Sequence, residues 1–272
     1  MRVLFLGDIV GRSGVDIVVD AVPSLRRQQS LDLVLVNAEN SDGGSGITPG
    51  IYKKLLAADV DGITLGDHIY RKKDIMEVLE KSDRMVKPAN YPSDAPGKSW
   101  AVVKSASGHQ VAFTSLMGRV FMKPVDCPFQ AATRVLEEIP EDVKIRIVDF
   151  HAEATSDKYL MGRYLDGKVS AVLGTHTHVP TADAQIFPGG TGFQCDLGMT
   201  GPHESILGRQ IENVMQATLS FRPIPFPVAK NDIRMNGVIL DIDHRTGQCN
   251  RIERFMMTRK EVDGLMDDDD WD

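Results

Sequence analysis

Two histidines placed two positions apart are the first residues in this chain that suggest chemistry. His176 and His178 follow the apolar stretch 169–173, where a buried strand is expected to end. Imidazoles spaced in this way can converge on one point, and imidazole is the commonest protein ligand of transition metals. Two such histidines also occur in ordinary loops, hydrogen-bonded or facing solvent. The pair alone therefore leaves a metal site and a plain loop equally open.

Other predicted strands end in side chains of the same kind. Apolar runs at 3–6, 33–36, 62–65 and 144–150 are typical of strands buried on both faces. The residues that follow them are Asp8, then Glu39 and Asn40, then Asp67 and His68, and finally His151. A mixture of carboxylate, amide and imidazole suits Mn, Fe or Zn in a two-metal site, in which a carboxylate bridges the ions.

Each of these candidates also has an ordinary structural explanation. Asp8 and Asp67 suit helix N-caps, and Asn40 suits a turn. His68 and His151 would fit partly buried histidines with hydrogen-bond partners. Because strand and ligand follow each other at five separate places, we favour one shared metal site over five unrelated explanations.

The elements that must position these ligands alternate between strand and helix. Helices are expected at 15–27, 49–56, 130–138 and 156–165, and β-hairpins at 99–114 and 238–256. This order indicates an α/β fold with functional groups at the carboxyl ends of its strands. Since the 272 residues show no repeat and no linker, we expect a single domain over residues 1–272.

Composition excludes several classes of protein. The net charge of −7 argues against bulk nucleic-acid binding by a basic surface, but it leaves open a small anionic substrate held by metal ions. No run approaches the roughly 18 to 20 apolar residues of a membrane span, and no signal peptide is visible. Three widely spaced cysteines fit a reducing compartment. These features predict a cytoplasmic protein without a membrane partner, and the acidic run 267–270 is expected at a solvated end.

Four longer motifs carry a family resemblance. They lie at 7–12, 37–40, 149–155 and 174–183 and read GDIVGR, NAEN, DFHAEAT and GTHTHVPTAD. They resemble the calcineurin-like metallophosphoesterases, and most closely their YmdB-type bacterial branch. The resemblance spans nearly the whole chain and implies a β-sandwich flanked by helices, with the active site at the strand C-terminal ends. It also implies hydrolysis of cyclic nucleotides or similar small phosphodiesters.

The resemblance further implies a role for each candidate residue. Two divalent or mixed-valence metal ions are expected, Fe or Mn first, with Zn and Mg as alternatives. The implied ligands are Asp8, Asn40 and His178 at the first metal, Glu39 as the bridge, and Asp67, His151 and His176 at the second metal. A hydroxide activated by the two metals would attack phosphorus, and His68 would protonate the leaving oxygen as general acid. Supporting contacts to the ligands are expected among Asn90, Glu153, Thr175, Asp183 and Asp196.

Asp67 departs from the pattern of the family, which usually has Gly-Asn-His where this chain has Gly66-Asp67-His68. An aspartate adds negative charge beside two dications, which should hold them more tightly and make them weaker Lewis acids. Two alternatives therefore stay open, a metal-binding regulatory protein with weak or lost catalysis and a phosphomonoesterase or nucleotidase. A homo-oligomer is the default expectation for the assembly.

Overall fold

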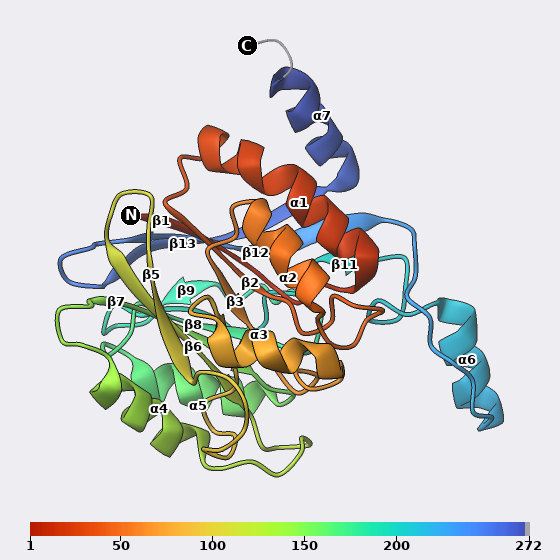
Figure 1. Ribbon diagram of the computed structural model, residues 1–272, viewed down its shortest axis with the longest axis horizontal. Coiled ribbons are helices and arrows are strands. Elements are labelled where there is room, and N and C mark those ends of the chain that lie inside the picture. The colour runs from red at the N-terminus through yellow and green to blue at the C-terminus, as the bar shows by residue number, and fades with distance from the viewer. Residues whose placement is uncertain (270–272) are drawn as a thin grey trace.

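Figure 1 shows the computed structural model, which describes residues 1–269, as two β-sheets packed together between layers of helices. Within these residues seven strands form the first sheet, in the order β11-β12-β1-β2-β3-β4, with β13 beside β12. Their bounds are β1 Arg2–Leu6, β2 Leu33–Asn37, β3 Gly62–Thr64, β4 Met85–Val86, β11 Gly201–Pro202, β12 Ile233–Ile242 and β13 Cys249–Thr258. Strands β1 to β4 are parallel, so their carboxyl ends reach the same edge.

The second sheet has the order β5-β6-β7-β8-β10-β9. Its strands are β5 Trp100–Lys104, β6 Gln110–Met117, β7 Ile145–His151, β8 Ala171–Thr175, β9 Gln185–Ile186 and β10 Gly192–Gln194. The four central strands, β6, β7, β8 and β10, are parallel, and the two outer strands pair antiparallel. Both sheets thus contain the parallel strands that the sequence pattern predicts.

The continuous apolar runs are explained by strands buried on both faces. In β1, Phe5 packs with Phe113 of the second sheet in the core between the sheets. Its neighbour Leu4 points to the opposite face and joins a second core with Val18 and Val22 of α1. Because successive side chains of a strand alternate between its faces, a strand between two cores needs apolar residues at every position.

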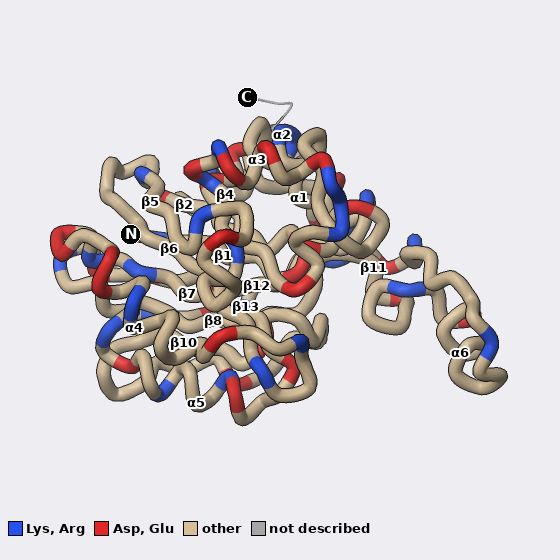
Figure 2. Tube along the Cα trace, turned by 60° about the horizontal axis from the view of Figure 1, so that its bottom comes forward, with Lys and Arg blue, Asp and Glu red and all other residues tan. Residues whose placement is uncertain are grey.

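Helices cover the outer faces of both sheets (Figure 1). The helices of the described residues are α1 Gly11–Gln28, α2 Pro49–Ala57, α3 Met76–Lys81 preceded by the 3₁₀ turn η1 Lys73–Ile75, α4 Pro128–Glu138, α5 Thr155–Leu165, α6 Ile211–Ser220 and α7 Arg259–Asp269. α1, α2 and α3 pack on the first sheet, and α4 and α5 on the second. α6 stands away from the sheets in both views (Figures 1 and 2) and buries none of its residues.

The α/β sandwich flanked by helices is confirmed, although some element limits differ from the prediction. α1 begins four residues early, at Gly11, so Gly14 belongs to the helix and not to a loop, and it lies close to the carbonyl of Thr200. β8 extends to Thr175, which pairs with the end of β7. The side chains of the acidic run 267–270 lie outside the described residues. Up to residue 269, no helix has the length and apolarity required to cross a membrane.

Candidate metal centre

The predicted ligands lie at the carboxyl ends of strands from both sheets. Those after β1, β2 and β3 come from the first sheet, and those at the ends of β7 and β8 come from the second. In chain order they are Asp8, Glu39 with Asn40, Asp67, His151, and His176 with His178. The face-to-face packing of the sheets therefore gathers residues that are more than 160 positions apart, as the hydrogen bond from the His176 amide to Asp8 illustrates (|i−j| of 168).

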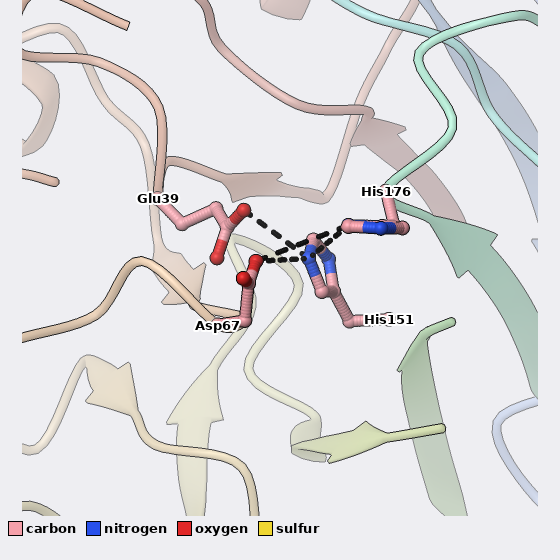
Figure 3. Close-up of side chains that lie close together, drawn as sticks. All are labelled: Glu39, Asp67, His151 and His176. Carbon is pink, nitrogen blue, oxygen red and sulfur yellow. Dashed lines mark hydrogen bonds and ion pairs between the residues drawn. The ribbon is translucent and has the colours of Figure 1, made fainter. Parts of the chain in front are cut away.

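Four of these side chains converge on one point (Figure 3). One ligand atom from each of Glu39, Asp67, His151 and His176 lies within 4.8 Å of the others. His151 is central, because its Nε2 lies 3.1 Å from Oε1 of Glu39 and 3.4 Å from Oδ1 of Asp67. Nδ1 of His176 lies 3.0 Å from the same nitrogen. Two carboxylates and two imidazoles form a donor set that suits Fe, Mn or Zn.

The other three predicted ligands border this cluster. Nε2 of His178 lies 3.8 Å from Oδ1 of Asp8 and 3.2 Å from Nδ2 of Asn40. The Asn40 amide also donates to Oε1 of Glu39 at 3.2 Å. Glu39 thus contacts both sets of ligands, as a bridging carboxylate must. Asn40 presents its nitrogen to His178, so a role as ligand requires the opposite orientation of its amide.

Burial and mutual attraction shift the pKa values of the cluster. Asp8 and Glu39 are fully buried. Burial raises the pKa of Asp8 to about 6. Burial also opposes ionisation of Glu39, but His151 and His68 nearby outweigh it and lower the pKa of Glu39 well below its ordinary value. The same attraction overcomes burial at His151 and raises its pKa well above the ordinary value. The opposite shifts of these two pKa values follow from the close contact of Glu39 with His151, 3.1 Å apart in the buried site.

Two buried carboxylate oxygens of the site lack a hydrogen-bond partner among residues 1–269. They are Oδ1 of Asp8 and Oδ1 of Asp67. An unsatisfied buried acceptor costs roughly 1–3 kcal/mol, and more when it is charged. Because a cation would satisfy both oxygens, the residues present fit the bound metal ions that the sequence predicts.

His68 lies beside the cluster and contacts it through one edge. Its backbone amide donates to Oε2 of Glu39 at 2.9 Å, and its Nδ1 lies 3.2 Å from Oε1 of the same residue. The side chain is 26% exposed, in contrast to the fully buried His151. Since Nδ1 faces Glu39, the other ring nitrogen, Nε2, is free to act on a molecule that enters from solvent.

Polar contacts behind two of the histidines orient their rings. Nδ1 of His151 lies 2.9 Å from Oγ1 of Thr175, which donates to Asp149 at 2.7 Å. Nε2 of His176 lies 3.1 Å from a carboxylate oxygen of Glu153. These contacts leave Nε2 of His151 and Nδ1 of His176 to face the cluster. Metal-ligating histidines usually have such a partner on the second nitrogen.

The loop that carries His176 and His178 is held in a strained shape. Both residues have positive φ angles, 96° and 67°. Such angles cost of order 1–3 kcal/mol in non-glycine residues and persist only when the surroundings enforce them. Asp196 provides this support by accepting bonds from the backbone and hydroxyl of Thr177, at 3.1 and 2.7 Å, and from buried Lys158 at 2.6 Å. The buried ion pair thus holds the loop in its ligand-presenting shape.

Gly66 shows how closely the elements approach at the site. A Cβ atom at this position would collide with the ring of His151 and with Oε2 of Glu39. Neither side chain has room to move, because both are fully buried. Gly66 is therefore required for its size and not for an unusual backbone angle.

The structure ranks the expected supporting residues. Thr175 and Glu153 contact ligands directly, and Asp196 holds the loop between two of them. Among the described residues, Asn90 and Asp183 show no contact with a predicted ligand; Asn90 donates to the end of β6, and Asp183 accepts from Tyr159 of α5. Sequence reasoning missed Asp149 and Lys158. Asp149 lies inside the motif at 149–155, two residues before His151, so its position was the signal that could have identified it.

Comparison with known proteins places this geometry in a family. The family described as YmdB-like protein matches residues 4–255. The chain belongs to this family. This YmdB-like protein is 41% identical over 257 residues to a 2′,3′-cyclic-nucleotide 2′-phosphodiesterase of Bacillus subtilis (strain 168), and the match covers 94% of this chain and 97% of the relative.

Two crystal structures share the fold closely. A hypothetical protein from Thermus thermophilus superposes with a TM-score of 0.89 at 40% identity, covering 95% of this chain and 99% of the other. A phosphatase from Mycoplasma pneumoniae gives a TM-score of 0.88 at 31% identity, covering 95% and 93%. The predicted resemblance to the YmdB-type metallophosphoesterases is thereby confirmed.

Proposed function

We propose that this protein is a metal-dependent phosphodiesterase that hydrolyses 2′,3′-cyclic nucleotides. The observation that carries the proposal is the convergence of Glu39, Asp67, His151 and His176 on one point. The relative from Bacillus subtilis, which matches over nearly its whole length, supports the substrate class.

Seven residues would hold two metal ions in this proposal. They are Asp8, Asn40 and His178 at one ion, Asp67, His151 and His176 at the other, and Glu39 between them. When bound, two divalent ions would activate water for attack and neutralise the phosphoryl oxygens. The protein contributes the alignment of its ligands, through the hydrogen bonds of Thr175 and the strained loop held by Asp196.

His68 would act as the general acid. Its contacts with Glu39 fix the ring and leave Nε2 available to donate a proton. The oxygen of a water molecule would bond to phosphorus and release one proton to solvent, the bond from phosphorus to the 2′ oxygen would break, and His68 would protonate that oxygen. The product is a nucleoside 3′-phosphate. General acid catalysis of this kind contributes roughly 10²- to 10⁴-fold to the rate.

The test is hydrolysis of 2′,3′-cyclic AMP by the Mn²⁺-loaded protein, with 3′,5′-cyclic AMP and 4-nitrophenyl phosphate as competing substrate classes. We expect 3′-AMP as product. His68→Ala should lower kcat by about 10²-fold or more at unchanged metal content. His244→Ala removes an exposed histidine outside the site and should leave both quantities unchanged.

The other outcomes separate the alternatives. Turnover of the monoester without the diester would instead establish a phosphomonoesterase or nucleotidase. Bound metal without turnover of any substrate would favour a regulatory metal-binding protein. A protein that binds no metal would overturn the site assignment itself.

A further inference from the structure

A pocket of about 530 Å³ opens next to the metal centre and shares Asp67 with it. Its other walls come from the segments that follow β3, β4 and β6. The volume lies within the range of roughly 300–1,000 Å³ that is typical of small-molecule sites. A molecule in this pocket would therefore adjoin the predicted metal ligands directly.

Two tyrosines give the pocket an aromatic wall. The rings of Tyr70 and Tyr91 lie 5.9 Å apart at an angle of 42°. The Tyr70 hydroxyl donates to the carbonyl of Pro96 at 2.7 Å, which fixes its ring. Pro124 and Val125 line the pocket from another loop. Flat aromatic and apolar surfaces of this kind suit the face of a nucleobase.

Two buried polar side chains, Lys87 and Asn90, hold these walls in place before any ligand binds. Lys87 is 2% exposed, and its ammonium group donates to the carbonyls of Pro92, Ser93 and Ala95. Such a lysine fixes the loop beside the Tyr91 ring. A wall that is already ordered loses little conformational entropy when a ligand stacks on it.

Asn90 joins the tyrosine wall to the loop that faces it. The side chain is fully buried, and its amide donates to the carbonyls of Met117 and Asp126 at 2.9 and 3.0 Å. Its carbonyl oxygen accepts from the Met117 amide at 2.8 Å. Because Asn90 precedes Tyr91 and Asp126 follows Val125, the two walls are tied together. The pocket is thus a built feature of the fold.

Charge at the pocket complements an anionic substrate. Arg71 and Lys123 line the pocket and are exposed, whereas the metal cluster beyond Asp67 is rich in carboxylates. Two exposed cations in the pocket lining would favour the approach of a phosphodiester anion to an otherwise acidic protein. The apolar wall and the cations together match a molecule with a flat ring at one end and a phosphate at the other.

We propose that this pocket binds the nucleobase of the substrate by stacking on Tyr91, which positions the cyclic phosphate at the metal centre. The inference rests on the proposed function and deepens it, because it makes the protein selective for nucleotides over phosphodiesters without a base.

The experiment compares two substrates on the Mn²⁺-loaded protein. One is 2′,3′-cyclic AMP, and the other is methyl ribofuranoside 2,3-cyclic phosphate, which keeps the sugar and the cyclic phosphate but lacks the base. We expect kcat/KM to favour the nucleotide by about 10- to 100-fold, the contribution typical of stacking on one aromatic ring. Tyr91→Ala should abolish this preference by lowering only the nucleotide value, and Tyr91→Phe should retain it. The control is Phe121, an aromatic residue that is 91% exposed and lies outside the pocket, and Phe121→Ala should change neither value.

Each other outcome has a distinct meaning. Equal wild-type kcat/KM for the two substrates would overturn the base pocket while leaving the proposed function intact. Equal losses on both substrates in Tyr91→Ala would place Tyr91 in support of the metal centre and likewise overturn the pocket. If the metal-loaded protein hydrolyses neither substrate, the proposed function fails. Equilibrium binding of adenosine then decides whether the pocket binds a nucleobase. Binding that Tyr91→Ala removes would then support it, and binding that is absent or unchanged would refute it.

Discussion

The two halves of the predicted metal centre are held together in different ways. In the half formed by Glu39, Asp67, His151 and His176, the four ligand atoms lie within 4.8 Å of one another. The imidazole of His151 lies between the two carboxylates, 3.1 Å from Glu39 and 3.4 Å from Asp67. The half formed by Asp8, Asn40 and His178 has one carboxylate, one imidazole and one amide.

In that second half the charges compensate one another less well. Burial raises the pKa of Asp8 to about 6, and one of its buried oxygens has no hydrogen-bond partner within residues 1–269. Asn40 turns its nitrogen toward His178. Oδ1 of Asp67 in the first half also lacks a partner within residues 1–269. The comparison teaches that the halves differ in their donors, since the first offers an ion two carboxylates and two imidazoles and the second only one of each with an amide. We therefore expect one metal ion to bind tightly and a second to bind more weakly.

Replacement of Glu39 should have the largest effect, because this residue contacts both halves. We expect Glu39→Gln to lower diester hydrolysis by about 10³-fold, equivalent to several kcal/mol, since a neutral amide cannot bridge two dications. The occupancy of both metal ions should fall, as measured by inductively coupled plasma mass spectrometry. Retention of two ions at full occupancy would show that Glu39 does not bridge.

A matched pair of histidine variants separates the halves. His176→Ala should weaken the tight binding event, and His178→Ala only the weak one, each by about 10- to 100-fold or more. Calorimetric titration of the metal-free protein with Mn²⁺ resolves the two events. The comparison fails if both variants weaken the same event, because the two histidines would then serve a single ion.

Variants of Thr175 test the hydrogen bond that supports His151 in the first half. Thr175→Val keeps the side-chain shape but removes the hydroxyl between His151 and Asp149, so we expect the tight affinity to fall by about 10-fold. Thr175→Ser retains the hydroxyl and should restore it. Equal affinities in the Val and Ser variants would mean that the His151 ring is oriented by packing alone.

Asp67→Asn should have the smallest effect, and it should change metal affinity and diester turnover in opposite directions. Loss of one negative charge should weaken the tight metal site by a few-fold, and it should raise diester turnover by a few-fold because the bound ions become stronger Lewis acids. Metal titration and steady-state kinetics on one preparation measure both. A fall in turnover at saturating metal would show that the carboxylate of Asp67 is required for activity.

Local sequence pattern determined a large part of this protein. Continuous apolar runs identified strands buried on both faces, because each face of such a strand meets its own core. The polar residues directly after those runs identified the predicted ligands, since parallel strands deliver their carboxyl ends to one edge. Both inferences need only neighbours in the chain, which is why they were available without a structure.

Other features were decided by the tertiary structure alone. The position of α6 is one of them, because this helix buries no residue although Ile211, Val214 and Met215 have the spacing of one helix face. The ion pair between Lys158 and Asp196 joins residues 38 positions apart, and Asn90 connects to Asp126 across the two strands β5 and β6. Such contacts depend on how the sheets and loops pack, and no repeating pattern of neighbouring residues predicts them. The sequence therefore determined which side chains stand at the strand ends, and packing decided which partners hold them there.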